Sequence, residues 1–283
     1  MDVLAATAAE RAPAAGRIFG AGDQAARFLE LISTGLFDPH DLLVAIDDGE
    51  LRGAMIAQTL PGHLAVVVPP TANDPATADA LFLGAIAHLG RRGVRLAQAY
   101  LDPTTDAASL ERHGFRCVTQ IESRIWRRGE VLAFRDPILH FAREFNESDF
   151  GATLLATYEG SLDAPEANVG ASAEAVLAGY RHGHAEQNWW LVSQHGRNVG
   201  VLLLGDTSSP QVGEVEYFGV VPSARGRGIG RAILNHAVTT FQRIGVYEVS
   251  VSVDARNLPA RTLYDELGFH PFRVQNLWLR GIS

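Results

Sequence analysis

One stretch of the sequence decides the fold: Val220-Val221-Pro222-Ser223-Ala224-Arg225-Gly226-Arg227-Gly228-Ile229-Gly230-Arg231. An apolar run rich in β-formers ends at Pro222, glycines and arginines follow, and apolar residues then recur at helical spacing. The order is therefore strand, glycine-rich turn and helix start. Glycines let a backbone approach a ligand closely, a helix start supplies free N–H groups, and arginines bond phosphate oxygens. The stretch predicts a pyrophosphate site.

The turn alone does not name its ligand. No Lys-Ser or Lys-Thr follows the glycines, so it is not a Walker loop. Gly226, Gly228 and Gly230 stand at every second residue, which is not the spacing of the Rossmann fingerprint. A glycine-rich turn without a ligand stays open as the alternative for this segment alone.

A second motif lies downstream, from Asn257 to Phe269. It follows the alternating run Val249 to Val253, which predicts a strand. Asn257 suits a helix N-cap, and Gly268 suits the residue after a helix end. The segment therefore predicts a strand followed by a short helix.

Together the two motifs resemble the GNAT acyltransferases. Arg225-x-x-Gly228-x-Gly230 is similar to their acyl-CoA pyrophosphate loop, and Asn257 to Phe269 is similar to their second signature, which ends in Tyr-x-x-x-Gly-Phe. The resemblance covers roughly Leu139 to Arg280. It implies an α/β (mixed α+β) fold, in which a mixed, mostly antiparallel twisted sheet is flanked by helices.

The chain also repeats itself. Leu101 to Phe115 echoes Val253 to Phe269, and in both halves a proline after an apolar run precedes a helical pattern. We therefore expect two tandem modules, at residues 1–130 and 138–283, in an arrangement that resembles the layout of the mycothiol synthases. The segment from Arg127 to Pro137, charged and closed by a proline, is the expected boundary.

The two modules differ where the chemistry should be. After Pro69 the first module has Pro70-Thr71-Ala72-Asn73-Asp74-Pro75, without glycine or arginine, and Leu110 stands where the second has Tyr264. Proline cannot donate an N–H group to a phosphate. We expect the first module to be degenerate and structural, and the second to be catalytic.

The resemblance implies catalytic roles for three residues. A strand glutamate commonly serves as base in this family; Glu214 and Glu216 both match, and solvated edge-strand acids are the alternative. Tyr264 matches the proton donor to the leaving thiolate, a role that suits a neutral tyrosine with a reference pKa of about 10. The alternative is a tyrosine that only packs.

The resemblance also implies how acyl-CoA is bound. A β-bulge between Phe218 and Val220 should free an N–H group for the thioester carbonyl, with Val220 as our choice. Asn257 should contact the pantetheine arm, cap the helix, or do both. The expected acyl-CoA-binding residues are Phe218, Val220, Arg225, Gly226, Arg227, Gly228, Ile229, Gly230 and Asn257.

The acceptor side is expected in the long acidic loop from Tyr158 to Asn168. Glu159 and Asp163 would attract a cationic amine, and Tyr158 would pack on its stem. A solvated acidic loop is the alternative interpretation.

Composition limits the remaining possibilities. A net charge of −8 disfavours nucleic-acid binding, and the single cysteine among 283 residues disfavours disulfides and a cysteine metal cluster. The pair His182 and His184 has no acidic or cysteine partner, so we expect a turn and no metal. Without a signal-peptide pattern or an apolar stretch of about 18 residues, we expect a cytoplasmic protein that does not bind membranes.

These observations favour an enzyme. We expect an N-acyltransferase that uses acetyl-CoA or another acyl-CoA on a small-molecule amine, as a monomer or homodimer. A non-catalytic acyl-CoA-binding or regulatory protein is the alternative, because such a protein would need only the turn.

Overall fold

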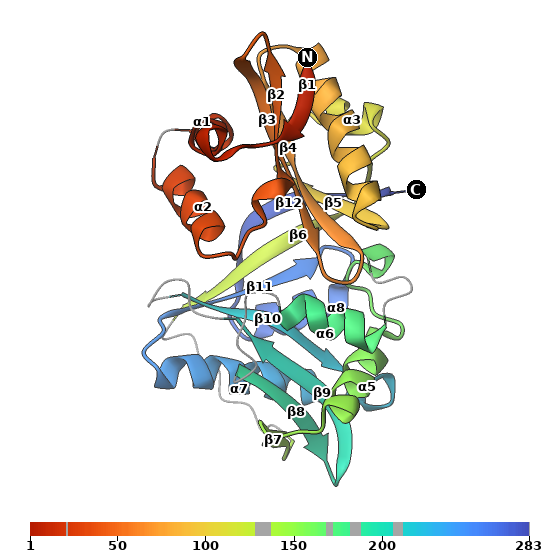
Figure 1. The fold of residues 1–283 in the computed structure, drawn as a ribbon. Coiled ribbons are helices and arrows are strands. Elements are labelled where there is room, and N and C mark those ends of the chain that lie inside the picture. The colour runs from red at the N-terminus through yellow and green to blue at the C-terminus, as the bar shows by residue number, and fades with distance from the viewer. Residues whose placement is uncertain (21, 128–136, 168–171, 182–187, 206–211, 283) are drawn as a thin grey trace. The chain divides into compact units, whose positions relative to one another are not determined.

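A computed structural model describes the chain except for residues 21, 128–136, 168–171, 182–187, 206–211 and 283. The chain forms two compact units (Figure 1). The first contains Met1–Val118 and Asn276–Ser283, and the second contains Thr119–Gln275.

The first unit is a sheet with helices on both faces. Its strands run in the order β1 (Asp2–Ala5), β2 (Leu42–Asp47), β3 (Glu50–Leu60), β4 (Leu64–Ala72), β5 (Leu96–Leu101), and the end of β12 (His270–Gly281). Only β4 and β5 pair in parallel among the registers of this unit's described strands. Two apolar cores cover its faces, one with α3 (Pro75–Arg91) and one with α1 (Ala8–Phe19) and α2 (Asp23–Ser33). A short helix, α4 (Ala108–Arg112), precedes β6.

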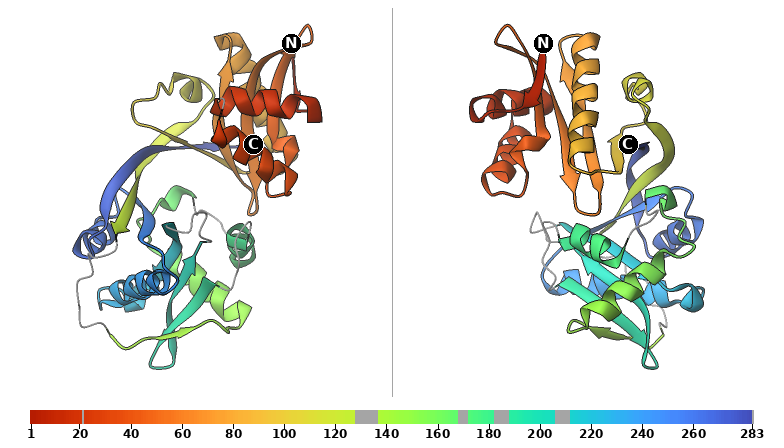
Figure 2. Two further views of the ribbon diagram at one scale, coloured as in Figure 1. Left: turned by 90° about the vertical axis from the view of Figure 1, so that its left-hand side faces the viewer. Right: turned by 45° about the vertical axis from the view of Figure 1, so that its right-hand side comes forward.

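The second unit has the same plan. Its strands run in the order β6 (Arg116–Arg127), β11 (Glu248–Asp254), β10 (Val212–Val220), β9 (Arg197–Leu204), β8 (Trp189–Gln194) and β7 (His140–Ala142). Helix α7 (Ile229–Arg243) packs on one face, and α5 (Glu147–Tyr158) and α6 (Ala173–Arg181) pack on the other (Figure 2). Alternate residues of β8 and β9 therefore enter different cores, as the two-residue period of a strand requires. Helix α8 (Leu258–Glu266) follows β11.

Each unit takes one strand from the part of the chain that was expected to form the other module. Within the second unit β6 pairs with β11, from Glu248↔Arg127 to Asp254↔Ile121. Within the first unit β12 pairs with β5, from Asn276↔Leu101 to Gly281↔Leu96. The expected division after residue 130 followed chain order, whereas the packing divides the chain at residues 118 and 275. The expected boundary segment lies largely outside the described residues.

Strand β10 parts from β11 halfway along its length. The two pair in parallel from Val212↔Glu248 to Glu214↔Ser250, and beyond Glu214 the described pairing of β10 is with β9. A register shift lies between Val215 and Tyr217, earlier than the expected bulge at 218–220. Residues two apart in a regular strand point to the same face, but the extra residue of a bulge reverses this. Val215 accordingly packs in the core with α7, whereas Tyr217 packs with α5.

Glycine lets β9 and β10 approach closely at this point. A Cβ atom on Gly200 would lie 2.4 Å from the Gly219 carbonyl oxygen and 3.2 Å from Ile233. A side chain there has to push away the backbone of β10, which is paired with β9 at this point.

We therefore expect Gly200→Ala to lower the free energy of unfolding by about 1–3 kcal/mol, the usual cost of overpacking. Gly179→Ala in α6 is the matched control, because a Cβ atom there meets nothing within 4 Å. Helix propensity predicts no loss for this control and a gain of up to about 1 kcal/mol. Urea denaturation followed by tryptophan fluorescence measures both, and equal losses would contradict the packing argument.

Candidate functional site

A cleft of about 650 Å³ opens in the second unit where β10 and β11 part. Four segments line it: the end of α5 with the following loop, the second half of β10, the glycine-rich turn, and the end of β11 with α8. The lining residues predicted from the sequence are Phe218, Val220, Arg225, Gly226, Gly228, Ile229, Gly230, Asn257, Tyr264 and Asp163. The predicted residues outside this lining are Glu214, Glu216, Arg227, Tyr158 and Glu159.

The turn presents the start of α7 to the cleft. Gly228 is the N-cap with φ 76° in the left-handed region, and Gly226 also has a positive φ of 73°. The carbonyl of Gly228 accepts the first helical hydrogen bond, from Ala232, so the N–H groups of residues 229–231 have no acceptor within the helix. Free N–H groups and the positive end of the helix dipole suit an anion.

Arg225 has a different contact set from the one expected. Its guanidinium donates to three backbone carbonyl oxygens: Val220 at 3.0 Å, Gly160 at 3.2 Å and Thr157 at 2.9 Å. The side chain therefore fastens the turn to β10 and to the end of α5. Arg227 is exposed, and Arg231, paired with Glu266, is the other arginine of the turn that lines the cleft.

The backbone of β10 offers a donor to the cleft. The N–H of Val221 donates to Val199 on β9 at 3.0 Å. Since successive residues of a strand point their N–H groups to opposite edges, Val220 and Phe218 direct theirs away from β9. Arg225 approaches the Val220 carbonyl from this same open edge. The N–H of Val220, a cleft-lining residue, therefore points to this open edge.

Tyr264 lies on α8 at the cleft wall and is 5% exposed. Its ring packs edge-on against Phe218, with 6.2 Å between centroids. Burial raises the pKa of Tyr264, the nearby Asp163 charge raises it further, and Arg124 opposes both. The phenol therefore keeps its proton at neutral pH.

The two strand glutamates differ in their surroundings. Glu214 is exposed and belongs to the part of β10 that is still paired with β11. Glu216 is half-buried, sits at the register shift, and is followed by Tyr217, which lines the cleft. Neither lines the cleft itself.

The loop after α5, residues 159–167, places one carboxylate at the cleft. Asp163 lines the cleft, and its Oδ1 accepts the N–H of Asp254 at 2.7 Å. Burial raises the pKa of Asp163. Glu159 is exposed and does not line the cleft, so Asp163 is the carboxylate of the two predicted here that reaches it. Asn168, the end of the predicted loop, lies outside the described residues.

Tyr158 turns toward a tyrosine cluster instead of the cleft. Its hydroxyl is 3.2 Å from that of Tyr180, and its ring meets Tyr217 edge-on. Burial raises the pKa of Tyr158 to about 12. Tyr217 and Thr157 line the cleft, with 2.7 Å between their hydroxyl oxygens, and the sequence reasoning missed both. Only their adjacency to predicted site residues could have drawn attention to them.

No group of three or more His, Cys, Asp or Glu side chains among the described residues could hold a metal ion. No helix of that part of the chain is long and apolar enough to cross a membrane. His182 and His184 lie outside the described residues.

Comparison with known proteins names a family for the segment that builds the cleft. Residues 154–269 match the model of the acetyltransferase (GNAT) family. Mycothiol acetyltransferase of Beutenbergia cavernae is 38% identical over 88 residues, 30% of this chain and 29% of that protein. The enzyme of the same name from Geodermatophilus obscurus is 37% identical over 77 residues, 27% of this chain and 25% of that protein. The chain thus spans less than a third of the length of these two relatives.

Solved structures share the fold over the whole chain. A GCN5-related N-acetyltransferase from Sphaerobacter thermophilus aligns with a TM-score of 0.68 at 23% identity, covering 100% of this chain and 96% of its own. A tandem GNAT protein from the clavulanic acid biosynthesis pathway aligns with a TM-score of 0.61 at 15% identity, covering 100% and 98%. The expected fold class and tandem arrangement are confirmed. The two motifs, the cleft and the segment that matches the acetyltransferase (GNAT) family model all lie in the second unit.

Proposed function

We propose that the second unit is an acyl-CoA-dependent N-acyltransferase that transfers an acetyl group directly to a small cationic amine. One observation supports the proposal: a helix start without a side-chain cap and the buried Tyr264 line the same cleft. An acyl-CoA-binding protein without turnover would have use for the helix start but not for the buried phenol.

The geometry suggests how the residues share the work. Backbone N–H groups at the start of α7 would hold the pyrophosphate of acetyl-CoA, and the N–H of Val220 would bond the thioester carbonyl. The amine forms the new C–N bond, and its proton leaves toward Glu216 through water. The C–S bond breaks, and Tyr264 gives its proton to the departing thiolate. Cys117 belongs to the first unit, so no covalent enzyme intermediate is proposed.

Asp163 is our proposed contact for the amine. It is the cleft-lining carboxylate of the loop at residues 159–167, and a carboxylate attracts a cationic amine before its deprotonation. The relatives named above are mycothiol acetyltransferases, which agrees with a small-molecule acceptor.

The first unit has a different helix start, and we propose a structural role for it. At the position of Gly228 the first unit has Asp74, the N-cap of α3, whose carboxylate accepts the Thr77 N–H at 2.9 Å. Hydrogen bonds from Thr77 lower the pKa of Asp74, so the group is charged. A carboxylate at the helix start satisfies the groups that a phosphate would use and repels that phosphate.

Gly228→Asp should weaken acetyl-CoA binding at least tenfold, because it places a carboxylate at the proposed pyrophosphate site. Gly245→Asp is the matched control: its φ of +84° imposes similar backbone strain, and its surroundings are open. Isothermal titration calorimetry with acetyl-CoA and CoA measures both variants. Equal affinities in the two variants would remove the turn from the binding site.

Tyr264→Phe should lower kcat about 10²- to 10⁴-fold, the usual contribution of a general acid, and change the Kd for acetyl-CoA less than threefold. Tyr180→Phe, which removes a hydroxyl outside the cleft lining, is the control. A thiol-release assay over a panel of amines measures turnover. A parallel loss of binding and turnover would argue against a proton donor, and binding without turnover in the wild type would favour the non-catalytic alternative.

Glu216→Gln should reduce kcat/KM about a hundredfold if this residue is the base, and should move the acidic limb of the pH–rate profile. Glu214→Gln, on the same strand but in its paired and exposed part, should change kcat/KM less than threefold. The reverse order of effects would assign the role to Glu214.

A further inference from the structure

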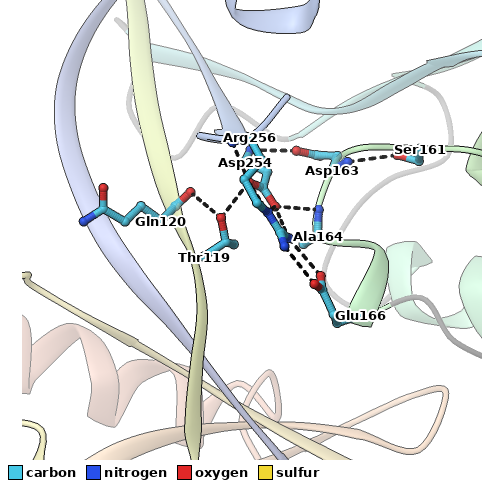
Figure 3. A network of polar contacts seen from close by, with 8 residues as sticks. All are labelled: Thr119, Gln120, Ser161, Asp163, Ala164, Glu166, Asp254 and Arg256. Atoms are coloured by element: carbon cyan, nitrogen blue, oxygen red, sulfur yellow. Dashed lines mark hydrogen bonds and ion pairs between the residues drawn. The ribbon is translucent and has the colours of Figure 1, made fainter. Parts of the chain in front are cut away.

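Asp254, the last residue of β11, makes two hydrogen bonds to the loop at residues 159–167. Its backbone N–H donates to Asp163 Oδ1 at 2.7 Å, and its carboxylate Oδ2 accepts the N–H of Ala164 at 3.1 Å. Figure 3 shows the two residues facing each other across this pair of bonds. The side chain of Asp163 and the peptide that follows it are therefore fixed by one residue.

The carboxylate of Asp254 is completely buried, yet it remains charged. Burial alone would raise its pKa, but hydrogen bonds from Arg256 and Thr119 lower the pKa below the ordinary value. Thr119 donates at 2.6 Å, and the Arg256 guanidinium donates to both carboxylate oxygens. A buried charge with so many donors holds its position firmly.

Arg256 connects Asp254 to Glu166, near the end of the loop. Its Nη1 and Nη2 donate to the two carboxylate oxygens of Glu166 at 2.8 and 2.9 Å, so the pair is bidentate (Figure 3). The same guanidinium therefore binds Asp254 on one side and Glu166 on the other. A bidentate pair fixes orientation as well as distance, which a lysine could not do.

The loop needs this support because its backbone is strained. Ala164 has φ 42°, in the left-handed region that residues with a Cβ atom rarely adopt. Such a conformation persists only where its surroundings impose it, and the hydrogen bond of the Ala164 N–H to Asp254 does so. The strain immediately follows Asp163, the residue that reaches the cleft.

We propose that Asp254 is a positioning residue for acceptor specificity: with Arg256 it holds the strained loop so that the Asp163 carboxylate stands in the cleft beside Tyr264. The inference rests on the proposed function for the role of the amine. It predicts that loosening Asp254 alters acceptor binding selectively, because Asp254 bonds residues 163 and 164 of the loop, whereas the acyl-CoA turn is joined through Arg225 to residues 157 and 160. A residue that only stabilised the fold would, when replaced, lower the free energy of unfolding without a selective effect on acceptor binding.

Asp254→Asn is the test. Asn offers one acceptor oxygen where Asp offers two, so the loop or the Arg256–Thr119 side loses a partner. We expect amide hydrogen exchange over residues 159–167 to speed up at least tenfold, with exchange in α7 unchanged. With the best acceptor of a panel containing cysteamine, glucosamine and spermidine, the acceptor KM should rise about tenfold, and kcat and the Kd for acetyl-CoA should stay within twofold.

The matched control is Asp41→Asn in the first unit. Asp41 is also 0% exposed, and it also accepts a Thr hydroxyl, from Thr59 at 2.6 Å, and a backbone N–H. It should lower the melting temperature comparably without changing the loop's exchange or the acceptor KM. Should Asp254→Asn fail to fold, Arg256→Gln replaces it, with Arg127→Gln at the exposed Arg127–Glu248 pair as its control.

The outcomes separate the two proposals. Unchanged exchange over residues 159–167 overturns the positioning role, whether or not any amine reacts. A rise of the acceptor KM and the acetyl-CoA Kd together also overturns it. Wild-type protein that acetylates none of the amines counts against the proposed function, and the exchange experiment still decides the role of Asp254.

Discussion

The separation of β10 from β11 is the constraint on which the site depends. Parallel neighbours normally satisfy each other's backbone groups, but this pairing ends at Glu214↔Ser250. Beyond it, the open edge of β10 carries the N–H of Val220 into a cleft whose far wall is Val253 and α8. The register shift between Val215 and Tyr217 reverses which side chains of β10 point to which face of the sheet. Phe218 therefore packs on the α7 side and Tyr217 on the α5 side. The end of the β10–β11 pairing and the register shift together leave room for the cleft and direct the N–H of Val220 toward it.

The two units show how the same fold position can favour or reject an anion. In the second unit a left-handed Gly228 leaves the start of α7 unfilled by any side chain. In the first unit the Asp74 side chain fills the start of α3 with its own negative charge. The backbone plan is shared, and the difference lies in the chemistry of one N-cap. Duplication of the fold therefore need not duplicate the site.

Local signals in the sequence predicted most of the second unit, and long-range pairing explains what they missed. The glycine-rich turn and the Asn257 helix depend on residues close in sequence, so their positions on the cleft could be predicted. The exchange of β6 and β12 depends on partners more than a hundred residues away, and β12 was not expected. Likewise, the contacts of Arg225 with carbonyls at residues 157 and 160 depend on how α5 packs, and no local pattern reports this.

The loop at residues 159–167 is held partly through its backbone, and this has a consequence for the proposed acceptor specificity. Arg225 binds carbonyl oxygens at Thr157 and Gly160, and Asp254 binds the N–H of Ala164. None of these contacts depends on which side chain stands at residue 162, which lines the cleft. Substitutions there can change the shape offered to the acceptor while the loop stays attached to the acyl-CoA side. The fold thus separates the residues that hold the loop from those free to vary, which is how a rigid scaffold can serve different acceptors.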